Sequence, residues 1–351
     1  MSTTLDGLQE PMVGAPMAGG PSTPALVAAV SDAGGIGVLG AGYKTVAALA
    51  ADVAATRALT GAPFGVNVFT PGAVVPANPD ALAAYAARLA AEAERTGVAL
   101  GAPRSDDDAF AGKVEALIAD PVAVVSFTFG LPPRDAVDRL HAAGSEVWIT
   151  VTSVREARMA AALGPDALIV QGVDAGGHRG VFADDATASD LTLLVALQLI
   201  GAAVGLPLVA TGGLTTGAAI GAALVAGARA AQVGTAYLRT PEAGTSPAQR
   251  AATATDAPTA LTRAFSGRTA RGIVNRLLTE HTAAAPAGYP EIHYLTTPLR
   301  AHGRATGDAD LVNLWAGQAH ALAPELPAGE LTRRLAADAR AAIAAAHERL
   351  G

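Results

Sequence analysis

The chain has 351 residues, a formal net charge of -7 at pH 7 and a sequence pI near 5.5. Its hydrophobic fraction of 51% and charged fraction of 16% provide ample material for a core and exclude a disordered or fibrous chain. The acidic balance argues against a general attraction to nucleic acid or anionic lipid, so a small molecule is the expected partner. No cysteine is present, which excludes a disulfide, a thiolate nucleophile and a cysteine-ligated metal.

The N-terminal segment MSTTLDGLQEPMVGAPMAGG contains acids and no basic, leucine-rich signal region. Glycine, proline and charged residues interrupt every apolar run before it reaches the ~20 residues that a membrane helix requires. We therefore expect no membrane segment and a cytoplasmic location. The length permits either one large barrel or two ordinary domains.

Short apolar runs recur along the first two thirds of the chain, separated by alanine-rich segments with helical spacing. They predict eight strands, at residues 11–16, 35–40, 64–69, 122–127, 146–151, 166–171, 207–212 and 230–235. Segments such as STPALVAAVSDAG fit helices that end at a glycine before the next strand. Because strands and helices alternate with short connections, we expect parallel strands and right-handed crossovers. The pattern suits an α/β fold, a closed (β/α)8 TIM barrel, although an open doubly wound sheet has the same alternation.

Small and polar residues gather where the predicted strands end. They are Met17 and Gly19, Asn67, Ser126, Thr150, Gln171 to His178, Thr211 to Gly213, and Gln232 to Thr235. In a closed barrel the ends of parallel strands meet at one rim, so all these residues would face the same space. This clustering favours the barrel over the open sheet.

The domain prediction places the barrel in residues 1–240, with an excursion near residues 73–107 that is long for a strand-to-helix connection. Residues 241–351 differ in character, with TPEAGTSP, PAGYPEIHYLTTPLR and a long alanine-rich helical end. We expect a mostly helical C-terminal segment that packs on the barrel. It would be either a lid over the rim or a set of helices that only protect the barrel.

Two glycine-containing turns follow the last two predicted strands. VATGGLTTGAAI places Gly212 and Gly213 between a predicted strand and a helix. QVGTAYL places Gly234 and Thr235 in the same position after the next predicted strand. Free backbone N–H groups and a positive helix end bind phosphate well there, although either turn alone could be only a tight turn. Because no GxGxxG or GxxxxGK[ST] segment accompanies them, a mononucleotide such as FMN fits better than a dinucleotide or triphosphate.

The segment IVQGVDAGGHRGVF ends an apolar run in small and polar residues and then His178. Its glycines indicate that another group approaches this backbone closely, where an imidazole could meet the reactive edge of a flat ring. No second histidine or carboxylate stands at ligand spacing within a helix turn, so no metal is expected here. We interpret Asp174, Asp184 and Asp185 as solvated loop acids, with orientation of the imidazole as the alternative.

We expect surface or packing roles for the other six histidines, which sit in helical or lid-like segments without a nearby polar cluster. They are His141, His281, His293, His302, His320 and His347.

Seven segments of the chain carry a family resemblance. They are PMVGAPMAGG, FGVNVFTPG, VVSFTFGLPP, VQGVDAGGHRG, LVATGGL, AAQVGTAYLRTPEAGTSP and AFSGRTARGIVN. Together they resemble the FMN-dependent class I nitronate monooxygenases, formerly called 2-nitropropane dioxygenases, from about residue 10 to about residue 315. AGGHRG followed by QVGT is the specific part of this pattern. The chain departs from it at Asp174, where many relatives have Glu, and Tyr289 and Tyr294 match less securely.

The resemblance implies a set of FMN-binding residues and one catalytic base. The flavin would be held by Asn67, by Gln171, Gly176 and Gly177, by Gly212 and Gly213, and by Gln232, Val233, Gly234 and Thr235. The backbone of Pro16, Met17, Ala18 and Gly19 would lie beside the isoalloxazine. His178 would be the base.

The implied reaction is the oxidation of alkyl nitronates, and of nitroalkanes, by O2 to a carbonyl compound and nitrite, with FMN doing the electron transfer. His178 would remove the α-proton of a neutral nitroalkane, for which an imidazole pKa near ~6.5 is suitable. The closest alternative is a flavin-dependent NAD(P)H reductase of enoyl-acyl carrier protein or quinone on the same scaffold. A barrel that binds a substrate phosphate without redox chemistry, and a flavin-carrying binding protein without turnover, are further alternatives.

Overall fold

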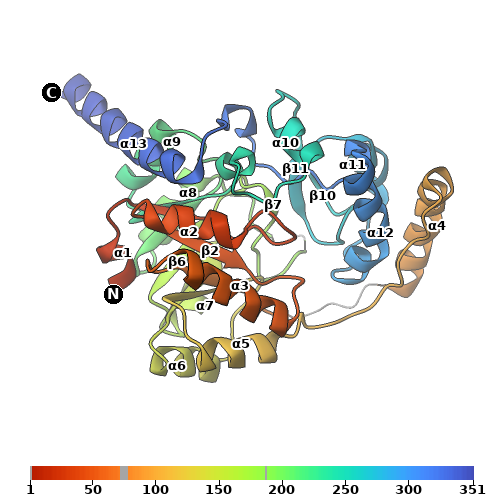
Figure 1. Ribbon diagram of the computed structural model, residues 1–351, viewed down its shortest axis with the longest axis horizontal. Helices are drawn as coiled ribbons and strands as arrows, with labels where there is room; N and C mark the ends of the chain where they lie inside the picture. The colour runs from red at the N-terminus through yellow and green to blue at the C-terminus, as the bar shows by residue number, and fades with distance from the viewer. Residues whose placement is uncertain (1, 72–77, 186–187) are drawn as a thin grey trace.

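The computed structural model describes residues 2–71, 78–185 and 188–351, and its centre is a closed barrel of eight parallel strands (Figure 1). The strands are β1 (Met12–Gly14), β2 (Ile36–Gly40), β3 (Gly65–Phe69), β4 (Val124–Thr128), β5 (Glu146–Val151), β6 (Ala167–Gln171), β8 (Leu208–Thr211) and β9 (Ala230–Val233). β9 pairs with β1, with Gln232 opposite Val13, and this pairing closes the barrel. The predicted (β/α)8 barrel is therefore confirmed, every predicted strand overlaps an observed one, and the open sheet is excluded.

Helices cover the outside of the barrel between successive strands. They are α2 (Pro24–Asp32), α3 (Val46–Leu59), α5 (Phe110–Ala119), α6 (Arg134–Ala142), α7 (Val154–Ala161), α8 (Leu193–Gly201) and α9 (Gly217–Val225), and the 3-10 helix η1 (Thr235–Arg239) follows the last strand. A hydroxyl N-cap fixes the start of several of them: the side chains of Thr23, Thr45, Ser153 and Thr216 each accept a hydrogen bond from the backbone N–H three residues later. These caps set where each connection from the rim ends.

Successive side chains along each strand point to opposite faces of the sheet, so they pack alternately in the barrel interior and in the core between the strands and the helices. Val13, Ile36, Trp148 and Ile169 pack with Leu5 in the barrel interior. Leu5 belongs to α1 (Thr3–Gly7), which therefore packs against that interior. The neighbouring positions on the strands, such as those filled by Met12, Val125, Phe127 and Val170, pack outward in the core shared with the helices. The interior is thus filled with apolar side chains below the rim.

A second, three-stranded antiparallel sheet stands beside the rim. Its order is β10 (Thr259–Thr262), β11 (Ala270–Ile273), β7 (Gly177–His178), so a two-residue strand from the β6 connection pairs with two strands from the C-terminal segment. After η1, the described helices of the C-terminal segment are α10 (Pro247–Thr253), α11 (Arg276–His281), η2 (Thr282–Ala284), α12 (Glu291–Thr306), η3 (Ala309–Leu311), η4 (His320–Leu322) and α13 (Ala328–Leu350). Figure 1 shows α10, α11 and α12 together on one side of the barrel.

The predicted excursion contains α4 (Pro79–Thr96), which lies beside α12 at the edge of the molecule (Figure 1). Residues 73–77 of that excursion lie outside the described residues. The last helix, α13, runs along α9 and α2 on the barrel wall. Its approach is close: a side chain at Gly217 would come within 2.3 Å of the Asp338 Cβ. The segment after residue 240 therefore contributes both to the rim, through its sheet and α12, and to the barrel wall, through α13.

No helix in the described part of the chain is long and apolar enough to span a membrane.

Candidate active site

A cavity of about 410 Å³ opens at the carboxyl ends of the barrel strands. Residues of β3, and residues at or after the ends of β1, β6, β8 and β9, form its floor, and β7, α12 and the segment Val312–Gly317 form its sides. Among the described residues, no Asp or Glu lines this cavity, whereas Arg300 and Arg304 both line it. The lining is therefore suited to an anionic ligand.

The structure brings nearly all of the predicted site residues together in this cavity. The lining includes Pro16, Met17, Ala18, Gly19, Asn67, Gln171, Gly176, Gly177, His178, Gly212, Gly213, Gln232, Gly234 and Thr235. Val233 is the exception, because its side chain packs in the outer core and only its carbonyl is used nearby, accepting a hydrogen bond from the Ala15 N–H at 2.9 Å.

The glycines of the β6 connection answer two different needs. Gly176 is required by protein packing, because a side chain there would come within 2.4 Å of the Ala316 carbonyl carbon. Gly177 has φ +74 and open space where a side chain would lie, so it leaves room in the cavity. The sequence suggested that a ligand approaches this whole backbone, but part of that close approach is made by residues 316–317 of the chain itself.

The turns after β8 and β9 provide hydrogen-bond donors without protein partners. The backbone N–H groups of Gly213 and Gly234 make no hydrogen bond to any described residue. Gly213 has φ +68, a backbone conformation that other residues rarely adopt. The Gln232 side-chain Oε1 beside them is buried and has no donor within the described chain. This unpaired amide and the free N–H groups fit a ligand that carries both a phosphate and neutral hydrogen-bonding groups, as FMN does.

Two side-chain amides on the floor are held within the protein. Asn67 donates through Nδ2 to the Ser126 and Thr128 hydroxyls at 2.9 and 3.0 Å. Gln171 accepts from the Gly180 N–H at 2.8 Å and donates to the His178 carbonyl at 3.1 Å, so it closes the β6 connection. Gln171 thereby places the histidine.

His178 is held from two sides. Its backbone is in β7, opposite Ala270 of β11, and its Nε2 lies 2.8 Å from the Ser266 hydroxyl oxygen. That hydroxyl also lies 3.2 Å from the Arg268 carbonyl and donates to it. Because a serine has a single proton, and its hydroxyl donates that proton to the Arg268 carbonyl, we infer that the proton between Nε2 of His178 and the hydroxyl is on Nε2. Nδ1 has no partner among the described residues and keeps its lone pair for a bound molecule.

Burial lowers the pKa of His178 from its ordinary value to about 3, and the positive charges of Arg268 and Arg300 act in the same direction. The sequence suggested an imidazole with an ordinary pKa, and the structure corrects this. The ring is therefore neutral at physiological pH, in the form that accepts a proton.

Two of the loop acids interpreted as solvated have defined partners. Asp174 accepts a hydrogen bond from the Leu193 N–H at the start of α8, at 3.0 Å. Asp184 pairs with Arg263 at 3.0 Å and accepts from the Thr269 N–H at 2.9 Å. Both fix loops around the site and neither touches the His178 ring, so the solvated interpretation was wrong for these two residues. Asp185 is exposed.

The sequence interpretation missed one whole wall of the cavity. His293, Thr297, Arg300 and Arg304 lie along one face of α12 and line the cavity. Their spacing in HYLTTPLRAHGR, at successive helical turns, is the signal that could have revealed a polar helix face. His293 is buried and packs on Tyr43, as a packing role requires, but it also faces the cavity, which the sequence did not indicate. Aromatic rings complete this side: Phe129, Tyr289 and Trp315 each lie within 5.8 Å of the His178 ring, centroid to centroid.

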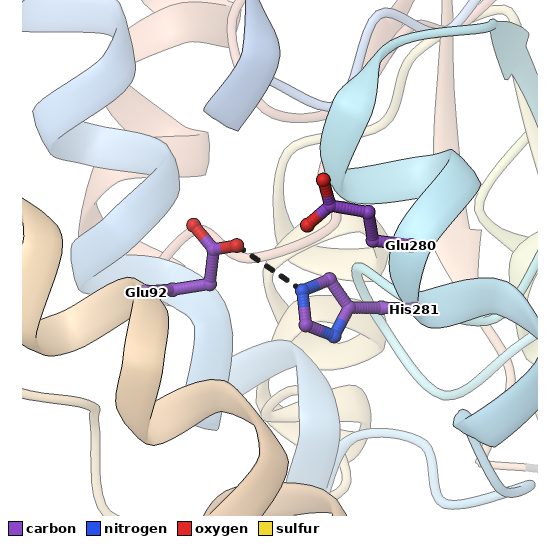
Figure 2. Close-up of side chains that lie close together, drawn as sticks. All are labelled: Glu92, Glu280 and His281. Atoms are coloured by element: carbon purple, nitrogen blue, oxygen red, sulfur yellow. Dashed lines mark hydrogen bonds and ion pairs between the residues drawn. The ribbon is translucent and has the colours of Figure 1, made fainter.

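A separate cluster of Glu92, Glu280 and His281 joins α4 to α11 (Figure 2). Glu92 accepts from Arg276 at 2.6 Å and from His281 at 3.2 Å, and it is also paired with Arg95. None of these residues lines the cavity. Because two guanidinium groups already neutralise the buried carboxylate, we interpret the cluster as an ion-pair network that attaches the excursion to the C-terminal segment.

The fold and the site define a (β/α)8 barrel with a buried histidine in a cavity at the rim that two arginines line, and comparison with known proteins gives the family. The family model "Nitronate monooxygenase" matches residues 2–338. The chain is 41% identical to a nitronate monooxygenase of Pseudomonas aeruginosa, over 96% of this chain and 98% of that protein. A nitronate monooxygenase of Paraburkholderia phytofirmans is 38% identical over 97% of this chain and 94% of that protein. The chain belongs to the nitronate monooxygenase family, a family of oxidoreductase enzymes.

Solved structures agree with this assignment. The nitroalkane oxidase from Streptomyces ansochromogenes superposes with a TM-score of 0.95 at 46% identity, covering 98% of this chain and all of that one. FabK from Thermotoga maritima superposes with a TM-score of 0.76 at 24% identity, covering 99% of this chain and 97% of that one. At this identity the second likeness shows the shared fold alone.

Proposed function

We propose that the protein oxidises alkyl nitronates with O2 to a carbonyl compound and nitrite, and that it uses FMN as its cofactor. The family membership supports the reaction class. The observation that carries the proposal is His178, a neutral imidazole with an available Nδ1 lone pair, in a cavity with no acidic lining residue among those described.

FMN fits the donors present in the cavity. Gly213 and Gly234 would hold the phosphate through their free N–H groups, and Gln232 would find a donor for its buried Oε1 in the bound molecule. Residues Pro16–Gly19 after β1 would lie beside the ring system. When bound, FMN would accept electrons from the substrate and pass them to O2.

The residues of the chain supply binding and proton transfer. A nitronate is already an anion, so its carbon needs no base, and the positive charge of Arg300 and Arg304 favours its entry. A neutral nitroalkane must first lose its α-proton, and Nδ1 of His178 would accept it. The His178 imidazolium formed in this way would be paired with the nitronate anion. This pairing would offset the low basicity that burial gives the His178 ring.

The test is product stoichiometry with the purified holoprotein. With ethyl nitronate as substrate we expect nitrite and acetaldehyde to be released in equal amounts. Two molecules of nitronate consumed for each O2 balance the oxygen atoms of these products. With NADH and a quinone or an enoyl thioester in place of nitronate we expect little turnover. Rapid NADH oxidation together with no nitrite from nitronates would instead support the reductase alternative.

A further inference from the structure

The cavity contains a second buried imidazole, that of His293 on α12. Its ring stacks on Tyr43, with 4.0 Å between centroids and 8° between planes. Tyr289 contacts it edge-on at 6.5 Å and contacts His178 at 5.8 Å, so a single aromatic ring lies next to both imidazoles. His293 therefore faces the same space as the expected base.

The ring of His293 is held from both ends by the surrounding chain. Tyr43 has φ +68, and its N–H donates to Asp108 at 2.9 Å, while Asp108 pairs with the fully buried Lys113 at 2.7 Å. On the helix, Arg300 donates through Nη2 to the His293 carbonyl at 2.7 Å and lies 3.2 Å from its Nδ1. Such an arrangement fixes the ring in one orientation.

The contact with Arg300 decides which nitrogen of His293 carries the proton. A guanidinium group only donates, so Nδ1 must present its lone pair to it, and the ring proton is on Nε2. Nε2 makes no hydrogen bond to any described residue, and it is not among the described buried atoms that lack a partner. It is therefore accessible, and the cavity is the space that His293 lines.

The two histidines thus present opposite groups to the cavity. His178 offers a lone pair on Nδ1, because its Nε2–H donates to Ser266, whereas His293 offers an N–H on Nε2, because its Nδ1 accepts from Arg300. Burial and the charge of Arg300 lower the pKa of His293 far below its usual range, so it stays a neutral donor rather than a cation.

We propose that His293 is a substrate-binding hydrogen-bond donor, which holds an oxygen of the nitro or nitronate group while His178 acts at the neighbouring carbon. Placing a donor on that oxygen stabilises the negative charge that develops there as the α-proton leaves. The assignment to a nitro oxygen rests on the proposed function. The presence of an oriented oxyanion donor at His293 does not.

The first test examines the His293 ring in the unaltered protein, and the variant His293→Phe serves only to assign its resonances. In the holoprotein labelled with 15N-histidine, we expect the His293 resonances, assigned by their absence in His293→Phe, to show the neutral Nε2–H tautomer. Nitrate, a planar unreactive oxyanion, should shift the Nε2–H resonance. An Nδ1–H tautomer, or no response of His293 to nitrate, would overturn the proposal.

The second test removes the donor and then restores one. The His178 resonances report nitrate in the cavity in every variant that keeps His178. His293→Phe keeps a ring beside Tyr43 and should weaken nitrate affinity about 10-fold or more, the usual effect of losing a hydrogen bond to a charged group. His293→Gln, with an amide donor, should restore most of it, and His302→Phe on the same helix, which does not line the cavity, should have no effect.

The outcomes separate the two proposals. Equal nitrate affinity in His293→Phe and the unaltered protein overturns the role of His293, whatever the enzyme oxidises. Nitrate binding that depends on His293, in a protein that releases no nitrite from nitronates, supports the donor and contradicts the proposed function.

Discussion

At the residue scale, His178 depends on one partner from a distant part of the chain and on one from its own connection. Ser266, on the connection between β10 and β11, determines which ring nitrogen is free, and Gln171 fixes the backbone carbonyl of the histidine. Neither contact involves the turns after β8 and β9, where we propose that the phosphate binds. The proposed base can therefore be altered without altering the proposed cofactor site, so mutation can separate the role of His178 from flavin binding.

Replacing His178 with asparagine should leave FMN bound but lower the rate with neutral nitroalkanes by ~10² to 10⁴, the usual contribution of a general base. Pre-formed nitronates need no deprotonation and should lose less. The ratio of the two losses in kcat/KM measures the proton-transfer role. Equal losses would make His178 a positioning or anion-binding group, and no loss with either substrate would remove it from the mechanism.

The pH dependence follows from the lowered pKa of His178. Burial favours the neutral imidazole, so the His178 ring remains unprotonated until the pH approaches about 3. We expect kcat/KM with a neutral nitroalkane to stay level as the pH falls from 7 to 5. A decline with a midpoint near ~6.5, the ordinary value of histidine, would show that the base titrates normally and would contradict the burial argument.

The turn after β8 allows a test of the cofactor site. Gly213→Asp should abolish flavin retention in a folded barrel, because it places a negative charge beside the phosphate and a side chain at φ +68. Flavin absorbance after gel filtration measures retention, and circular dichroism checks the fold. A variant that stays fully yellow would show that Gly213 is only a turn residue.

The sequence predicted the barrel half of this site and missed the other half for a physical reason. Residues at strand ends share a rim by topology alone, so Asn67, Gln171 and Gly213 could be grouped from the order of strands and helices in the sequence. His293 and Ser266 reach the cavity only through the packing of the C-terminal segment. Ser266 lies 88 residues from His178 in the chain, and no local pattern encodes that contact.

At the element scale, the ion-pair network around Glu92 attaches α4 to α11 (Figure 2), together with a hydrogen bond from Arg88 to the Glu280 carbonyl at 2.7 Å. The side chain of Glu92 is 4% exposed, whereas Arg276 is 24% exposed. Loss of a fully buried pair costs ~3–5 kcal/mol, and the exposure of the arginine reduces this to roughly 1–3 kcal/mol. The attachment is thus stronger than that of an ordinary surface pair.

Replacing Glu92 with glutamine should therefore loosen α4 without unfolding the barrel. We expect limited proteolysis within α4 to become about 5- to 100-fold faster, since local opening controls cleavage. Glu115→Gln, which removes a comparable but exposed pair with Arg139, is the matched control and should cleave as the unaltered protein does. Unchanged cleavage of the Glu92 variant would mean that apolar contacts, such as those of Tyr85 and Leu89, hold the helix.

At the scale of the whole molecule, the barrel and the C-terminal segment form one site. The barrel provides the free N–H groups of the last two turns, and the C-terminal segment provides α12, Ser266 and Trp315. Gly317 connects the two, because its N–H donates to the Thr235 hydroxyl at 3.0 Å. We propose that residues 241–351 act both as a cover for the cavity and as support for the barrel wall, and that neither part makes the site alone.

The central claim is that a nitronate bound in this cavity delivers electrons to FMN. The most direct measurement is the absorbance of the purified holoprotein after anaerobic mixing with ethyl nitronate. We expect the absorbance of oxidised flavin to decrease within the time of one turnover and to return when O2 is admitted, with nitrite released. A flavin spectrum that nitronate leaves unchanged, but that NADH bleaches rapidly, would contradict the claim.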